Sequence, residues 1–194
     1  MTSDELIKAF SLDGVGKAGA VFDLTKLTWM NGQYIRRLSA GMLFDEIDSF
    51  LEASVKEALM QFSKEDQIQM IFSVQDNLET LADINRYLDV YVDSDDVFQS
   101  AVDTISFDDQ FQRSVTLFCY AIQSVSSAWD VAFIKQCMDT ILTETGFGKG
   151  KVFKPIRLAC TARGSGPDLA TVILLLGRER ILSRLDHVCH RFSV

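Results

Sequence analysis

Residues 45–62 read DEIDSFLEASVKEALMQF, and this stretch decides the class of fold. Its apolar positions recur every three or four residues, which is the period of an amphipathic helix. These positions are Ile47, Phe50, Leu51, Val55, Ala58, Leu59 and Phe62. The pattern predicts one helix over residues 45–62, with its apolar side turned towards a core.

The same period continues on both sides of this stretch. Ser63 is placed to cap the next helix, with Asp66 at the capping-box distance. Its apolar stripe is Met70, Ile71, Val74, Leu78, Leu81, Ile84 and Leu88. Ser94 precedes a third helix, and residues 111–122 and 131–142 have the pattern of two more. Near the N-terminus, Asp23 is placed to cap a helix whose apolar face carries Leu27 and Met30. Successive helices with short polar links predict an all-α fold.

The last quarter of the chain begins with GFGKGK at residues 146–151, which predicts a flexible basic connector. Beyond it lie an apolar segment at 155–160, a loop at 162–166 and a helix that starts at Pro167-Asp168. A basic amphipathic helix follows Gly177. We therefore expect a connector over residues 1–41, a first helical subdomain over 42–146 and a basic second subdomain over 147–194.

The charge of the chain is distributed unevenly. The whole chain has a net charge of −8, but residues 147–194 hold nine Lys and Arg against three acids, a net +6. The first 146 residues therefore carry −14. A local positive surface is enough to attract phosphate, although a solvated basic helix face has the same composition.

Independent catalysis and metal binding have little support in the sequence. The two histidines, His187 and His190, lie near the C-terminus, and nothing nearby completes a set of zinc ligands. We therefore predict no metal and no catalytic residue. The GxGxxG match at residues 14–19 lacks the preceding strand that a dinucleotide site needs. With no apolar run of membrane length and no signal-peptide core, we expect a cytoplasmic chain with no membrane partner.

Two compound motifs carry a family resemblance. The first is AVFDLTKLTWMNGQYIR at residues 20–36. The second comprises GKGKVFKPIR at 148–157, GPDL at 166–169 and LGRER at 176–180. Together they resemble the C-terminal, anticodon-binding region of bacterial-type glutamyl-tRNA synthetases, a class I aminoacyl-tRNA synthetase family.

The resemblance implies a helical cage that reads the anticodon of tRNA(Glu), with no DNA partner. The residues that match the family's anticodon contacts are Arg157, Gly166, Pro167, Leu169, Ala170 and Asn77. Lys149, Lys151, Lys154 and Arg163 are candidates for contacts with the tRNA backbone. An arginine can pair with or stack on an unpaired base, and a helix N-terminus can receive phosphate.

Two departures from the family pattern bear on specificity and on the loop. Asn77 takes the place of an arginine that contacts the third anticodon base in glutamate-selective members, so tRNA(Gln) is a second expected partner. Cys160 and Ala162 stand where the family usually has leucine and glycine, which bears on the local loop geometry.

The family's catalytic signatures, a HIGH-type motif and a KMSKS-type loop, do not occur in the sequence. We expect the chain alone to be noncatalytic and without a cofactor, and ATP and Mg²⁺ to belong to a catalytic region outside it. The first expectation is an excised domain of a glutamate–tRNA ligase. The alternative is a free-standing paralogue that serves as a protein-interaction or assembly module.

Overall fold

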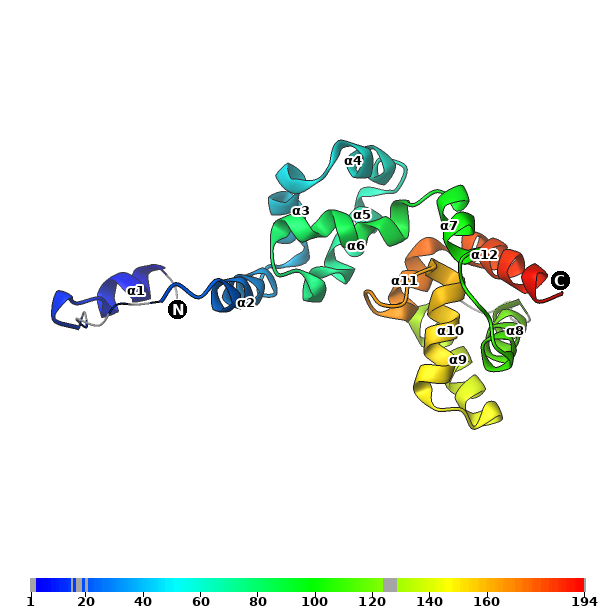
Figure 1. Ribbon diagram of the computed structural model, residues 1–194. Coiled ribbons are helices and arrows are strands. Elements are labelled where there is room, and N and C mark those ends of the chain that lie inside the picture. The colour runs from blue at the N-terminus through cyan, green and yellow to red at the C-terminus, as the bar shows by residue number, and fades with distance from the viewer. Residues whose placement is uncertain (1–2, 15, 17–18, 20, 124–128, 194) are drawn as a thin grey trace.

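The computed structural model describes residues 3–14, 16, 19, 21–123 and 129–193, and the regular structure within them is helical (Figure 1). The α-helices are α1 (Ser3–Ala9), α2 (Leu24–Ile35), α3 (Ala40–Ile47), α4 (Ala53–Leu59), α5 (Lys64–Ser73), α6 (Ile84–Val92), α7 (Asp95–Val102), α8 (Asp109–Gln123), α9 (Val131–Thr145), α10 (Lys149–Thr161), α11 (Leu169–Leu176) and α12 (Arg178–His190). Short 3₁₀ turns lie between several of them. The predicted all-α fold is confirmed.

The predicted helix starts at Asp23, Ser63 and Ser94 are confirmed. The Asp23 carboxylate accepts a hydrogen bond from the Lys26 amide at 3.0 Å. The Ser63 hydroxyl accepts one from the Asp66 amide at 3.1 Å, and Ser94 caps α7 in the same way. Each side chain satisfies an amide that has no partner inside its helix, which fixes where the helix begins.

The single helix predicted over residues 45–62 is wrong, because the chain breaks between α3 and α4. A 3₁₀ turn, η2 (Asp48–Phe50), ends α3, and Leu51 and Glu52 are extended. The Asn85 amide of α6 holds this break: its nitrogen donates to the Phe50 carbonyl, and its oxygen accepts from the Glu52 amide, both at 2.9 Å. A long-range contact therefore overrides the local helical period.

The apolar stripe predicted over residues 63–88 is buried except at Leu81, which is half-buried, but it does not run along one helix. Helix α5 ends at Ser73, and two 3₁₀ turns, η3 (Gln75–Asn77) and η4 (Leu81–Asp83), precede α6. Gln75 is buried and donates to the carbonyls of Ile35 and Leu38 at 2.8 and 2.9 Å. These side-chain bonds tie η3 to the C-terminal end of α2 and to the residues that follow it.

The contacts that α2 makes account for several residues of the first compound motif, at residues 20–36. The Asn31 side chain donates to the Glu79 carbonyl at 2.6 Å, and Arg36 donates to the Asp76 carbonyl at 2.9 Å. A Cβ on Gly32 would lie 3.2 Å from the Leu78 carbonyl oxygen, so glycine lets the two segments approach. Leu27 and Met30 lie on α2 as predicted, and both are exposed.

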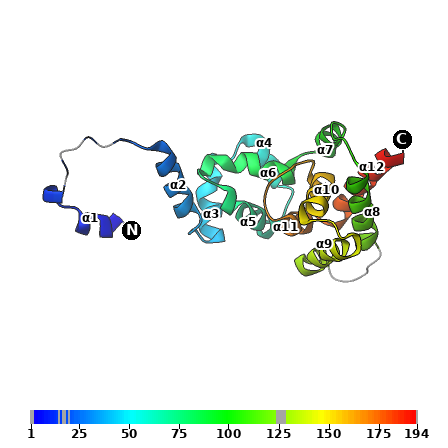
Figure 2. The same ribbon diagram turned by 60° about the horizontal axis from the view of Figure 1, so that its bottom comes forward.

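Helices α3 to α12 form two packed groups that meet at α11. Helices α3, α4, α5 and α6 pack together, and α8 packs against α9, α10 and α12. Helix α11 contacts α5 and α6 on one side and α9 and α12 on the other, and it lies between the groups in both views (Figures 1 and 2).

The segment around residue 146 is more ordered than a flexible connector. Gly146 ends α9 with φ 66°, Gly148 is the N-cap of α10, and Lys149–Lys151 form its first turn. Helix α10 packs on α8 and α9, so the chain on both sides of residue 146 shares a core. The domain limits at residues 41 and 146 stay predictions about folding units.

Candidate nucleic-acid interface

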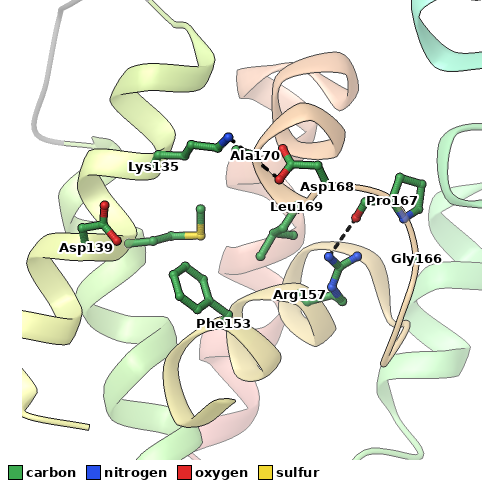
Figure 3. A pocket seen from close by; sticks show the side chains of 10 residues that line it. Lys135, Asp139, Phe153, Arg157, Gly166, Pro167, Asp168, Leu169 and Ala170 are labelled. Carbon is green, nitrogen blue, oxygen red and sulfur yellow. Dashed lines mark hydrogen bonds and ion pairs between the residues drawn. The ribbon is translucent and has the colours of Figure 1, made fainter. Parts of the chain in front are cut away.

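A cavity of about 400 Å³ opens where α9, α10 and the start of α11 meet (Figure 3). It brings together five of the six predicted anticodon residues, namely Arg157, Gly166, Pro167, Leu169 and Ala170. The remaining lining residues are Lys135, Met138, Asp139, Phe153 and Asp168. This volume lies in the range of small-ligand sites.

Arg157 and the loop before α11 hold each other in place. The Arg157 guanidinium donates to the Pro167 carbonyl at 2.8 Å. Gly166 has φ 147°, a conformation that side chains disfavour, and a Cβ there would lie 3.4 Å from an Arg157 nitrogen. Burial lowers the pKa of Arg157, and the nearby Asp168 opposes that shift. The arginine head is thus fixed at the edge of the cavity with donors to spare.

The start of α11 corrects one prediction about the helix. Asp168 is the N-cap and Leu169 the first helical residue, so Pro167 lies before the helix and not in its first turn. The Asp168 carboxylate accepts from the Thr171 amide at 3.0 Å, and Lys135 Nζ lies 4.0 Å from it. A carboxylate at this helix end disfavours phosphate. The mixed charges suit the edge of a nucleobase, which offers both donors and acceptors.

Helix α9 and Phe153 also line the cavity, although neither was predicted to. Phe153 lies one helical turn before Arg157, and the i, i+4 spacing on one helix is a signal that points to it. An aromatic ring of this kind can stack on an unpaired base. Lys135 and Asp139 come from a different helix, and no local pattern links them to Arg157.

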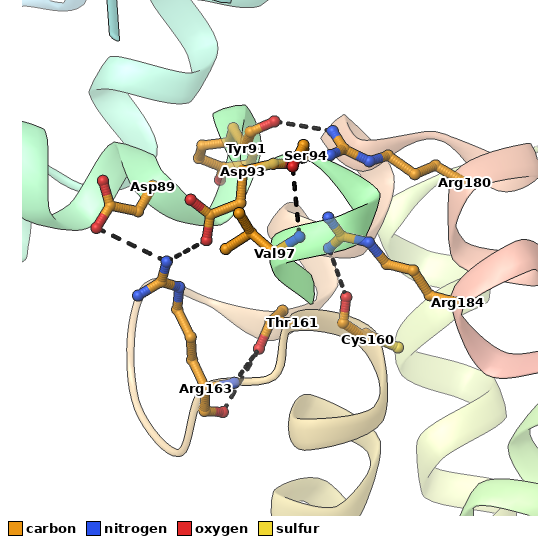
Figure 4. A network of polar contacts seen from close by, with 10 residues as sticks. All are labelled: Asp89, Tyr91, Asp93, Ser94, Val97, Cys160, Thr161, Arg163, Arg180 and Arg184. Carbon is orange, nitrogen blue, oxygen red and sulfur yellow. Dashed lines mark hydrogen bonds and ion pairs between the residues drawn. The ribbon is translucent and has the colours of Figure 1, made fainter. Parts of the chain in front are cut away.

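The four predicted RNA-backbone residues fall into two kinds. Lys149, Lys151 and Lys154 are exposed on α10, and the last two line a separate cavity of about 300 Å³. Arg163 instead faces inward, with its guanidinium 2.5 Å from the Asp93 carboxylate and 3.7 Å from Asp89 (Figure 4). The three lysines fit phosphate contacts, whereas the charge of Arg163 is engaged within the molecule.

The other arginines of the basic C-terminal segment also bind the protein itself. Arg180 donates to the carbonyls of Tyr91, at 2.9 Å, and Asp93. Arg184 donates to the Cys160 carbonyl, and Arg191 donates to the Val102 carbonyl at 2.6 Å. The net charge of residues 147–194 therefore overstates the positive surface that a ligand meets.

Asn77 lies apart from the other predicted contacts. It is half-buried at the end of η3, and its backbone N–H donates to the Val74 carbonyl at 2.9 Å. The segment around it is held by Arg36 and Gln75, and Asn77 does not line the cavity at Arg157. The predicted helix at this position is a 3₁₀ turn, and the selectivity role of Asn77 stays a prediction.

The loop after α10 contains a strained residue at one of the two departures from the family pattern. Ala162 is the C-cap of α10 and has φ 55°. Because glycine relieves this conformation, we expect Ala162→Gly to raise the free energy of unfolding by about 0.5–1 kcal/mol. Urea denaturation measures this change. Gly146→Ala is the matched control, since φ is 66° there, and it should lower stability. A destabilised Ala162→Gly protein would contradict the strain argument.

Neither a metal site nor a membrane span is found among the described residues. No group of three or more His, Cys, Asp or Glu side chains lies close enough together there to hold a metal. None of the helices in that part of the chain has the length and apolar character needed to span a membrane. The expected lack of a cofactor stays a prediction.

Comparisons with known proteins place the cavity at Arg157 inside a known family of domains. A family model described as the anticodon binding domain covers residues 53–189, which include the whole cavity at Arg157. The chain belongs to the anticodon-binding domain family. Within the family, the chain is 32% identical to the glutamate–tRNA ligase of Symbiobacterium thermophilum, over 97% of this chain and 39% of that protein. It is also 32% identical to the glutamate–tRNA ligase of Alkaliphilus metalliredigens, over 95% and 38%.

A solved structure shows the same arrangement of helices as this anticodon-binding domain. The glutamate–tRNA synthetase from Elizabethkingia anophelis superposes with a TM-score of 0.71 and 25% identity, over 96% of this chain and 36% of that chain. The chain thus spans about two fifths of the length of the curated relatives it matches. The resemblance drawn from the two compound motifs is confirmed.

Proposed function

We propose that the chain binds the anticodon loop of tRNA, as the anticodon-reading part of a glutamate–tRNA ligase. The observation that carries this proposal is the cavity in which Arg157, Gly166, Pro167, Leu169 and Ala170 meet. Its mixed charges and the Phe153 ring suit an unpaired base. We propose tRNA(Glu) as the main partner and tRNA(Gln) as the second. ATP and Mg²⁺ then act in a catalytic region outside these residues, in the cytoplasm.

The proposal is tested by titrating the chain with tRNA(Glu), tRNA(Gln) and an unrelated tRNA. We expect Arg157→Ala to weaken binding by about 1–3 kcal/mol if the guanidinium pairs with a base edge. Arg157→Lys should bind tRNA little better than Arg157→Ala does, because an ammonium lacks the planar donor fork of a guanidinium. Arg37→Ala, an exposed arginine beside Tyr34, serves as the control. Equal binding of all three tRNAs, unaffected by Arg157→Ala, would rule out anticodon reading.

A second candidate function, protein interaction, is favoured by the exposed apolar surface of α2. Trp29 is 60% exposed, and Leu24, Leu27 and Tyr34 are also exposed. Apolar patches of this kind mark contacts with other proteins or domains. The tRNA titration separates the two candidates, because an interaction module has no reason to depend on Arg157.

A further inference from the structure

A second cavity, of about 270 Å³, lies beside the same loop but opens towards α6. Its walls are Arg86, Tyr87 and Val90 of α6, Arg157 and Thr161 of α10, and residues 163–167. We propose that Arg86 and Tyr87 form a second nucleotide site, which receives a base and its phosphate from the RNA strand that enters the cavity at Arg157. This inference rests on the proposed function.

Arg86 and Tyr87 have the chemistry of a nucleotide platform. The guanidinium carbon of Arg86 lies 5.7 Å from the centroid of the Tyr87 ring. Arg86 is exposed, and within the described part of the chain it makes no salt bridge, so its charge is available. Tyr87 is half-buried and lines the cavity beside Arg86. Aromatic rings and arginines together bind single-stranded RNA by stacking and by charge.

The two cavities share one wall. Arg157, Gly166 and Pro167 line both of them, so the loop separates two neighbouring spaces. Two consecutive nucleotides could place one base on each side of this loop. The parts of the shared wall contact one another, because Arg157 donates to the Pro167 carbonyl and a Cβ on Gly166 would lie 3.4 Å from an Arg157 nitrogen.

The first cavity contains carboxylates and the second does not, and this difference indicates which cavity receives a phosphate. The first contains the carboxylates of Asp139 and Asp168 beside its cations. The second is lined by three arginines and no carboxylate, and of these Arg163 is neutralised by Asp93 and Asp89. The remaining charge on Arg86 and Arg157 favours a phosphate group, which the first cavity disfavours. The second cavity therefore suits a nucleotide held by its ring and phosphate.

The test uses the full chain and an RNA hairpin that carries the anticodon stem and loop of tRNA(Glu). We expect Tyr87→Leu to weaken binding roughly 10-fold, because leucine fills the space without offering a ring to stack on. Tyr87→Phe should bind as the unmodified chain does. Arg86→Ala should lower the slope of log K against log salt by about 0.7–0.9, the loss of one phosphate contact. Arg37→Ala is the matched control, since Arg37 is exposed and lies 5.5 Å from the Tyr34 ring.

The outcomes separate this inference from the function on which it rests. If the hairpin does not bind the unmodified chain, the proposed function fails and the second site fails with it. If Arg157→Ala weakens binding while Arg86→Ala and Tyr87→Leu do not, only the second site is overturned. Circular dichroism of each variant reports whether it is folded, and Arg86→Ala, on an exposed helix face, leaves the core intact.

Discussion

Replacing Arg184 with alanine is expected to lower the free energy of unfolding by about 2–3 kcal/mol, the sum of a lost buried hydrogen bond and lost packing. Its side chain is only 3% exposed, and its guanidinium carbon lies 4.4 Å from the Phe98 ring centroid. It donates to the Cys160 carbonyl at 2.8 Å. That carbonyl is among the last four of α10, which have no partner inside the helix.

The burial of Arg184 also has an electrostatic cost that limits the expected loss. Burial, which leaves the charged form poorly solvated, and the neighbouring charge of Arg180 lower the pKa of Arg184 to about 10. Asp95 opposes this shift, with its Oδ1 3.9 Å from Arg184 Nε. Removing this poorly solvated charge therefore offsets part of the fall in the free energy of unfolding. The loss of the hydrogen bond to Cys160 and of the contact with Phe98 outweighs this return.

Urea denaturation measures the effect, and a melting temperature about 5–10 °C lower should accompany it. Arg184→Met is the matched variant, because it keeps the apolar stem and removes the donors and the charge. We expect it to fall between the alanine variant and the unmodified chain. An alanine variant as stable as the unmodified chain would show that Arg184 is a net burden, contrary to this account.

The second large effect concerns the lysines of α10. We expect the triple variant Lys149→Ala, Lys151→Ala, Lys154→Ala to weaken tRNA binding roughly 100-fold at about 0.15 M salt. The reason is that each phosphate contact contributes about 0.7–0.9 to the slope of log K against log salt. All three side chains are exposed, so their loss should leave the fold intact. Titrations at several salt concentrations measure the slope directly.

Arg191→Ala is the control for this experiment, because Arg191 belongs to the same basic segment but donates to the Val102 and Asp103 carbonyls. It should reduce stability and leave the salt slope unchanged. If the slope fell for Arg191→Ala and not for the lysine variant, the division of the basic residues into two kinds would be wrong.

The sequence predicted the class of fold and most helix starts, because capping residues and apolar periods act locally. It failed where distant side chains decide the backbone. Asn85 breaks the helix expected over residues 45–62, and Gln75 helps to stop the one expected over 63–88. The apolar period still predicted most of the burial, since Ile47 and Leu59 in the first stretch and Met70 and Leu88 in the second are buried, although Phe50 is exposed.

The candidate site was predictable only along its own segment. Residues 157–170 are close in sequence, so one motif marked five lining residues together. Lys135 and Asp139 reach the cavity because α9 packs against α10 and α11, which no local pattern contains. The charge count also misled, because it cannot separate the exposed lysines of α10 from Arg180 and Arg184, which bind backbone carbonyls.

Helix α11 has a consequence for the order of folding. Its sequence is LATVILLL, and it contacts α5 and α6 as well as α9 and α12. Such a helix is too apolar to stand in water with either side uncovered. Neither group can shield it alone, so its burial requires both to be assembled. We therefore expect the two groups to unfold together as one cooperative unit.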